Sequence, residues 1–120
     1  MPVPSGGRDS TDNVDRVLAA LADPMRRRIL DLLAGQPEST ATLLADELPV
    51  SRQAVVQHLA VLESVELVAS GRVGRERRYR VRPERLTATA AWMTRVAQQW
   101  DSRLNAIRLL AEAAEPPVDD

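Results

Sequence analysis

The chain has 120 residues, enough for one domain with a modest core, and its 44% hydrophobic and 28% charged residues are typical of a globular protein. It contains no cysteine, which excludes disulfides, thiolate metal sites and cysteine nucleophiles. Its formal net charge of −1 argues against an indiscriminate polyanion binder. No apolar run approaches the ~20 residues that a membrane helix needs. We therefore expect a cytoplasmic protein without a membrane partner.

The N-terminal segment, residues 1–11, contains Pro, Gly and Ser but no apolar core, so we expect a flexible tail and not a signal peptide. The folded domain is expected to span residues 12–115, and residues 116–120 are expected to be disordered. Just after the tail, Val14, Val17, Leu18 and Leu21 form an amphipathic segment.

A helix is predicted to begin at Pro24, because Asp23 is a capping residue directly before a proline at the first helical position. Apolar residues follow at helical spacing until Gly35 and Pro37 end the segment. Thr40 then opens a second, short helix. The residues of this helix expected to face inward are Leu43, Leu44 and Leu48.

Residues 50–62 have the layout of a DNA-reading helix. Ser51 is a good N-cap, and Val50 with Val55 can form a hydrophobic staple at the start of the helix. Val55, Leu59 and Leu62 recur at i, i+4 and i+7, so one face is committed to a core. Two short helices joined by a tight turn, the second with an exposed polar stripe, are the helix-turn-helix pattern.

The outer face of this reading helix is free to contact bases. Arginine and glutamine there can make bidentate contacts to guanine and adenine, and a small apolar side chain can contact a thymine methyl. His58 lies beside the buried stripe, so a half-buried structural imidazole and a DNA contact both remain open. For the polar residues, the alternative is a merely solvated face. The expected DNA contacts from this segment are Ser51, Arg52, Gln53, Val56, Gln57 and His58.

Charge is unevenly placed along the chain. Residues 71–85 hold seven arginines against two glutamates, a surplus of +5, whereas residues 35–70 hold one arginine against five acidic residues, a deficit of −4. Strand-like runs on either side of a turn at Gly71 and Gly74 predict a two-stranded hairpin. A basic hairpin after a recognition helix is the wing of a winged helix, although it can also be a solvated charged edge. The expected DNA contacts here are Arg72, Arg75, Arg77 and Arg78.

Pro83 is expected to begin a long helix with a wide apolar stripe at 4-3-4-3-4 spacing. A winged-helix core is already closed by its own helices and hairpin, so a second subunit is expected to cover this stripe and the amphipathic N-terminal segment. Trp92 and Trp100 could alternatively line a ligand pocket between subunits. The expected dimer-interface residues are Val14, Leu18, Met93, Trp100, Leu104 and Ile107.

The predicted fold class is therefore mainly α with a small β-hairpin, a winged helix-turn-helix with long N- and C-terminal dimerisation helices. Three segments, ALADPMRRRILDLL, LPVSRQAVVQHLAVLE and GRVGRERRYRV, occur in this order. Together they closely resemble the ArsR/SmtB-type winged-helix transcriptional regulators of bacteria, over about residues 14–112. The resemblance implies a homodimeric repressor that binds an inverted repeat in double-stranded DNA and is released by a signal.

The chain departs from the pattern of that family at two places. Metal-sensing members carry a cysteine pair near the helix before the recognition helix, or histidines and carboxylates on the last helix. This chain has no cysteine and a single histidine, so it resembles the metal-independent branch, with no metal, no cofactor and an unknown inducer. The family usually has a glycine where this chain has Glu66. Either the reading helix ends differently here, or Glu66 accepts a strained left-handed backbone.

Two other functions remain open at this stage. A winged helix can be a protein-interaction module that never touches nucleic acid, and the acidic balance of residues 35–70 favours that alternative. An enzyme is disfavoured, because the chain has no glycine-rich phosphate loop, no cysteine and one histidine without an evident partner.

Overall fold

The computed structural model describes the backbone of residues 6–114 and the side chains of residues 12–114. Helix α1 spans Gly6–Leu21 and so begins inside the segment expected to be a flexible tail. The tail boundary expected at residue 12 is therefore wrong, because residues 6–11 are helical. The tail predictions for residues 1–5 and 116–120 lie outside the described residues.

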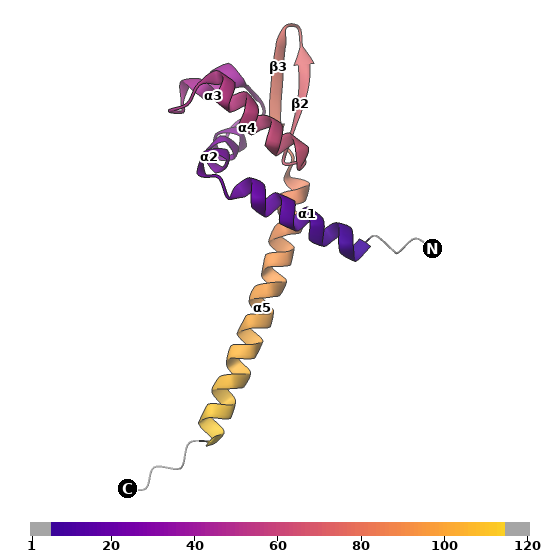
Figure 1. Ribbon diagram of the computed structural model, residues 1–120, viewed down its shortest axis with the longest axis vertical. Coiled ribbons are helices and arrows are strands. Elements are labelled where there is room, and N and C mark those ends of the chain that lie inside the picture. The colour runs from indigo at the N-terminus through magenta and orange to yellow at the C-terminus, as the bar shows by residue number, and fades with distance from the viewer. Residues whose placement is uncertain (1–5, 115–120) are drawn as a thin grey trace. The chain divides into compact units, whose positions relative to one another are not determined.

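The chain divides into two compact units, Met1–Thr89 and Ala90–Asp120. The first unit has the winged helix-turn-helix architecture expected from the sequence (Figure 1). Its helices after α1 are α2 (Pro24–Ala34), α3 (Ala41–Asp46) and α4 (Arg52–Ser64). Its antiparallel sheet has the order β1-β3-β2 and is formed by β1 (Ser39–Thr40), β2 (Val68–Val73) and β3 (Glu76–Val81).

The helices of this unit begin where the sequence places their caps. Asp23 accepts hydrogen bonds from two amides in the first turn of α2, at 2.8 and 3.3 Å. The Thr40 hydroxyl accepts from the Leu43 amide at 3.2 Å, and the Ser51 hydroxyl accepts from the Ala54 amide at 3.1 Å. All three predicted N-caps are confirmed, and each satisfies an amide that has no partner inside its helix.

The core of the first unit is built around the inner face of α4. Val55, Leu59 and Leu62 are each 0% exposed, as their spacing predicts. Leu43 was expected to face inward, but it is 57% exposed. Helix α3 is so short that one stripe of it reaches the core, and Leu43 lies outside that stripe. The inward positions of this segment are Ala41, Leu44 and Leu48.

Strands β2 and β3 form the predicted hairpin, joined by a turn at Gly74 and Arg75. Gly74 has a φ of 64°, which glycine accepts without strain and which two-residue hairpin turns require. Gly71, expected in the turn, instead lies within β2. Strand β1 was not predicted: it is two residues long and pairs with β3 at Ser39 opposite Tyr79.

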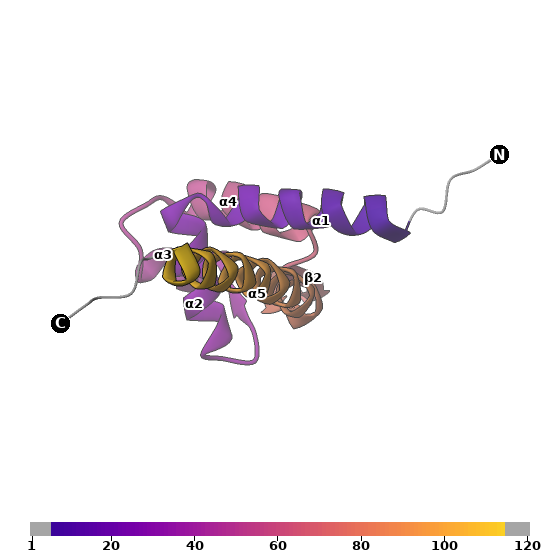
Figure 2. The ribbon, with the colours of Figure 1, turned by 90° about the horizontal axis from the view of Figure 1, so that it is seen from below.

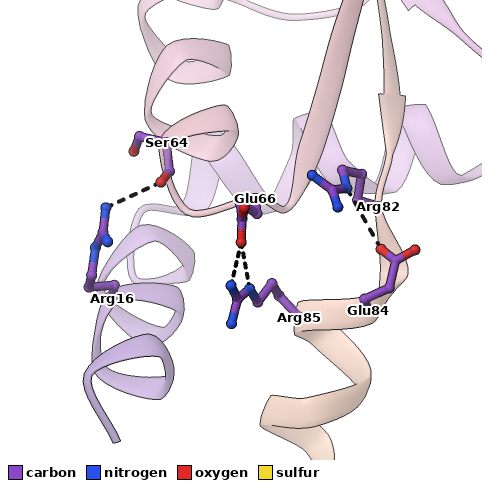
Figure 3. A network of polar contacts seen from close by, with 6 residues as sticks. All are labelled: Arg16, Ser64, Glu66, Arg82, Glu84 and Arg85. Carbon is purple, nitrogen blue, oxygen red and sulfur yellow. Dashed lines mark hydrogen bonds and ion pairs between the residues drawn. The ribbon is translucent and has the colours of Figure 1, made fainter. Parts of the chain in front are cut away.

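The C-terminal end of α4 turns sharply into β2 through Glu66. This residue has a φ of 62°, so it occupies the left-handed backbone that the sequence pattern raised as one of two possibilities. The Leu67 amide donates to the Leu62 carbonyl at 2.9 Å and closes the end of the helix. The Glu66 carboxylate accepts a hydrogen bond from Arg85 Nε at 2.8 Å (Figure 3). A charged contact therefore accompanies the strained backbone.

Helix α1 also reaches this corner of the unit. It passes the C-terminal end of α4 (Figure 2), where Arg16 Nη2 donates to the Ser64 carbonyl at 3.2 Å. At the other end of α1, Arg26 and Arg27 of α2 donate to the carbonyls of Ala20 and Leu21. These two arginines complete the C-terminus of α1 and are not free side chains.

Helix α5 spans Pro83–Ala114, and from Ala90 onward it makes up the described part of the second unit. Pro83 begins it as expected. Six of its large apolar side chains are exposed in the single chain: Met93, Trp100, Leu104, Ile107, Leu109 and Leu110. Within residues 6–114, no helix is both long and apolar enough to cross a membrane.

Candidate nucleic-acid interface

The outer face of α4 presents polar side chains to solvent. Gln53 and Gln57 are exposed, on the side opposite the buried stripe. Ser51 is committed to the N-cap, so its hydroxyl is already an acceptor within the fold. Val56 and His58 are half-buried, and Val56 packs against the core. The two glutamines are thus the side chains of this face with the greatest freedom to contact a partner.

The arginines of the β2–β3 hairpin differ in their surroundings. Arg72, Arg75 and Arg77 are exposed on and near the turn. Arg78 instead forms an ion pair, its Nη1 lying 2.9 Å from Glu38 Oε1. This pair links the hairpin to the segment before β1. The DNA contact expected from Arg78 stays a prediction.

A hollow of about 770 Å³ lies between the hairpin and the start of α4. Helix α3 contributes the exposed Leu43 to this hollow, and α4 contributes Val56. Arg52, at the first turn of α4, also reaches it, with its Nε donating to the Thr42 hydroxyl at 3.1 Å. The arginines that line the hollow are Arg52, Arg72, Arg75 and Arg77.

The hollow therefore combines four guanidinium groups with one carboxylate, that of Glu76. Such an excess of planar donors suits phosphate oxygens, which arginine can contact bidentately. Thr42 and Leu43 also line this surface, and neither was expected there from the sequence. The spacing of Ala41, Leu44 and Leu48 could have revealed it, since that stripe leaves Leu43 outside.

The expected dimer-interface residues fall into two groups. Val14 is 6% exposed in the single chain, so it offers little surface to a second subunit, and its assignment to the interface stays a prediction. The neighbouring Leu18 keeps 36% of its surface exposed. The remaining four residues of the set are each more than half exposed, and all lie on α5: Met93, Trp100, Leu104 and Ile107.

Known proteins share both the sequence pattern and the fold. A protein-family model described as a helix-turn-helix domain matches residues 21–70. The HTH-type transcriptional regulator Rv2034 of Mycobacterium tuberculosis is 39% identical over 99 residues, which cover 82% of this chain and 89% of the relative. The transcriptional repressor SdpR of Bacillus subtilis is 31% identical over 91 residues, covering 76% of this chain and 100% of the relative.

Among solved structures, an ArsR-like transcriptional regulator from Rhodococcus sp. RHA1 is similar, with a TM-score of 0.76 and 42% identity. The match covers 86% of this chain and 96% of that one. The chain belongs to the ArsR family of winged helix-turn-helix transcriptional regulators. The solution structure of Mb0332 from Mycobacterium bovis, a homodimeric winged helix-turn-helix DNA-binding domain, is also similar, with a TM-score of 0.63 and 29% identity over 82% of this chain and 91% of that one.

Within this ArsR-family chain, residues 12–114 contain no group of three or more His, Cys, Asp or Glu side chains placed to hold a metal ion. The cap of α2 is an electrostatic feature of this unit, and His58 is one of the charges that act on it. Desolvation works to raise the pKa of Asp23, but hydrogen bonds from the amides of Met25 and Arg26 and the positive charges of His58 and Arg26 outweigh it. The pKa of Asp23 is therefore held below its usual value of 3.8.

This shift predicts how the stability of the protein depends on pH. Because the folded-state pKa of Asp23 is depressed, its charge stabilises the fold above pH 3.8, and that contribution is lost as the pH falls through the folded-state value. Asp23→Asn keeps a capping side chain and removes only the charge. We expect its urea midpoint to lie below that of the unmodified protein at pH 7, with the difference closing below pH 3.8. A difference that persists into acid would contradict this role.

Proposed function

We propose that this ArsR-family chain is a sequence-specific DNA-binding regulator that acts in the cytoplasm as a homodimeric repressor on an inverted-repeat operator. The observation that carries the proposal is the placement of the exposed Gln53 and Gln57, on a rigidly capped helix, beside a hollow lined by four arginines. A merely solvated helix face needs no neighbouring cluster of guanidinium groups. No catalytic role is part of the proposal.

The two parts of this surface are assigned different tasks. Glutamines on the outer face of α4 can hydrogen-bond base edges in the major groove, which distinguishes one base pair from another. The hairpin arginines contact phosphates, which fixes the position of the protein on the duplex without reading sequence. Arg52, at the first turn of α4 and bonded to Thr42, lies where both tasks meet.

The homodimer is supported by the apolar surface of α5. Met93, Trp100, Leu104 and Ile107 recur at helical spacing and are 53–61% exposed in the single chain. A contiguous apolar stripe of this kind marks a protein interface. The homodimeric state of Mb0332 supports a second copy as the partner. Two symmetry-related reading helices would meet half-sites about 10 bp apart, or a multiple of that, on one face of the duplex.

The division between base and phosphate contacts can be tested by two substitutions. Gln57→Ala is expected to remove a base contact worth roughly 1–3 kcal/mol and to relax the preference at one position of each half-site. Arg75→Ala is expected to weaken specific and non-specific DNA alike. It should lower the salt slope of binding by about 1 per lost phosphate contact, hence about 2 per dimer. Footprinting and salt titration measure both effects.

Arg78→Ala is the matched control on the same hairpin, because its guanidinium is paired with Glu38. It should lower the salt slope by less than Arg75→Ala does. If Gln57→Ala leaves every operator variant ranked as before, or Arg75→Ala keeps the full slope, the corresponding assignment is wrong. A complete lack of DNA binding at low salt would favour a protein-interaction module.

The dimer can be tested at the centre of the α5 stripe. Leu104→Asp should bury an unpaired charge in the interface at a cost of about 3–5 kcal/mol, so the dimer should dissociate while each chain stays folded. Ser102→Asp adds the same charge on the opposite face of the helix and serves as the control. Sedimentation at several concentrations measures the assembly. A well-folded monomer for the unmodified chain, or equal dissociation in both variants, would overturn the proposed interface.

We further propose that regulation by this protein does not use a metal ion. The chain has no thiol and a single imidazole, whereas tight zinc sites use three or four protein ligands. Operator affinity should therefore stay within about twofold on adding zinc or a chelator, because the ion has no site through which to couple. Elemental analysis that finds a stoichiometric transition metal in the purified protein would refute this.

A further inference from the structure

A second polar hollow lies away from the DNA-facing surface, where α1, the end of α4 and the start of α5 meet (Figure 3). Its volume is about 270 Å³, and it belongs entirely to the first unit. Its lining is almost wholly polar. The residues that form it are Asn13, Arg16, Ser64, Val65, Glu66 and Arg85.

Positive charge exceeds negative charge in this hollow. Arg85 donates to the Glu66 carboxylate, and with Arg82 and Arg16 it holds the pKa of Glu66 below its usual value. Arg82 also forms an ion pair with Glu84, its Nε lying 3.9 Å from Glu84 Oε2. Arg16 has no ion pair with any carboxylate among residues 12–114, and its one hydrogen bond there is to the Ser64 carbonyl. With respect to residues 12–114, most of the five N–H donors of its guanidinium are therefore available to an acceptor.

The side chain of Glu66 indicates what the arginines of this hollow bind, because its carboxylate accepts a hydrogen bond from Arg85. The φ of 62° at Glu66 is a conformation that glycine adopts freely and that other residues adopt at a cost. Among the described residues, Glu66 is the only one other than glycine with a positive φ. The left-handed turn places a carboxylate against Arg85, so the hollow already contains one internal oxyanion at its edge.

We propose that this hollow binds a small oxyanion ligand, held through its carboxylate or phosphate group between Arg16 and Arg85 in exchange with the Glu66 carboxylate. Planar guanidinium groups bind both kinds of oxyanion bidentately. The Asn13 amide lies on the same lining and adds a further donor. Where the protein also binds DNA as proposed above, the ligand would contact α4 directly at its C-terminal end and so act on the reading helix.

The binding step is tested without DNA, so its outcome does not depend on the proposed DNA-binding function. The full-length protein is titrated with inorganic phosphate and, separately, with acetate, while sodium chloride keeps the ionic strength constant. Backbone amide NMR signals of residues 13–16, 64–66 and 85 are expected to shift and saturate with phosphate, acetate or both. Saturation by phosphate alone would restrict the ligand to phosphate esters, and saturation by acetate alone to carboxylates.

Two arginine variants separate this site from general charge effects. Arg16→Gln should weaken binding about tenfold, the loss expected for one charge-assisted hydrogen bond. Arg28→Gln removes the same charge from an exposed position on α2 and should leave the affinity unchanged. Equal losses in the two variants, or shifts confined to the hairpin arginines, would show screening or an adventitious ion only and would overturn the proposal.

Glu66→Gly is expected to strengthen oxyanion binding, whereas Arg16→Gln is expected to weaken it. Glycine accepts a φ of 62°, so the fold should persist, while the competing carboxylate is removed. The affinity for the oxyanion should therefore rise several-fold, and Glu66→Gln should change it in the same direction. Glu38→Gln, which breaks the ion pair to Arg78 elsewhere in the unit, is the control. If Glu66→Gly and Glu66→Gln bind no more tightly than Glu38→Gln, the proposed exchange is wrong.

Discussion

The architecture of the first unit depends on the burial of one face of α4. Val55, Leu59 and Leu62 are completely excluded from solvent, so the rotation of this helix about its axis is fixed. A fixed rotation determines which side chains point outward, and the Ser51 cap determines where the helix begins. The exposed glutamines owe their position to apolar packing on the far side of the same helix. The surface that can bind a partner is thus a consequence of the core.

The two ends of α4 are held by different interactions. At its start, the Ser51 hydroxyl caps the first turn of the helix. Arg52 donates a hydrogen bond to Thr42 and so links this end of the helix to α3. At its end, Arg16 and Arg85 contact the segment around Glu66 from α1 and from the first turns of α5. The contacts at both ends are polar and partly or fully exposed, so they are easier to rearrange than the buried apolar face.

The sequence predicted those features that depend on near neighbours in the chain. Caps at Asp23, Thr40 and Ser51 need only the first turn of the following helix, and the hairpin turn needs only Gly74 and its flanking strands. The family resemblance led to the unusual backbone at Glu66, because a glycine was missing from an otherwise matching segment. The caps and the turn could be predicted from neighbouring residues alone, and the backbone at Glu66 was raised as one of two possibilities by the resemblance to the family.

The features that sequence reasoning missed depend on residues far apart in the chain. Arg78 pairs with Glu38, forty positions away, and alternation along a strand carries no sign of that partner. Strand β1 is too short to produce a periodic pattern and exists because β3 offers it an edge. Val14 and Leu18 belong to one amphipathic segment, and only the packed structure shows that the first is buried within the chain while the second stays partly exposed.

The same long-range pairing decides how much of the basic charge can act on a nucleic acid. The surplus of +5 over residues 71–85 includes Arg78 and Arg85, whose guanidinium groups are bound to Glu38 and Glu66. Arg72, Arg75 and Arg77 of the same segment are instead exposed around the hairpin turn. The salt dependence of DNA binding measures how many phosphates the protein neutralises, which can be fewer than the number of arginines in the segment. The arginines are therefore divided between a group that fastens the winged helix together and a group, beside α4, that remains available to a polyanion.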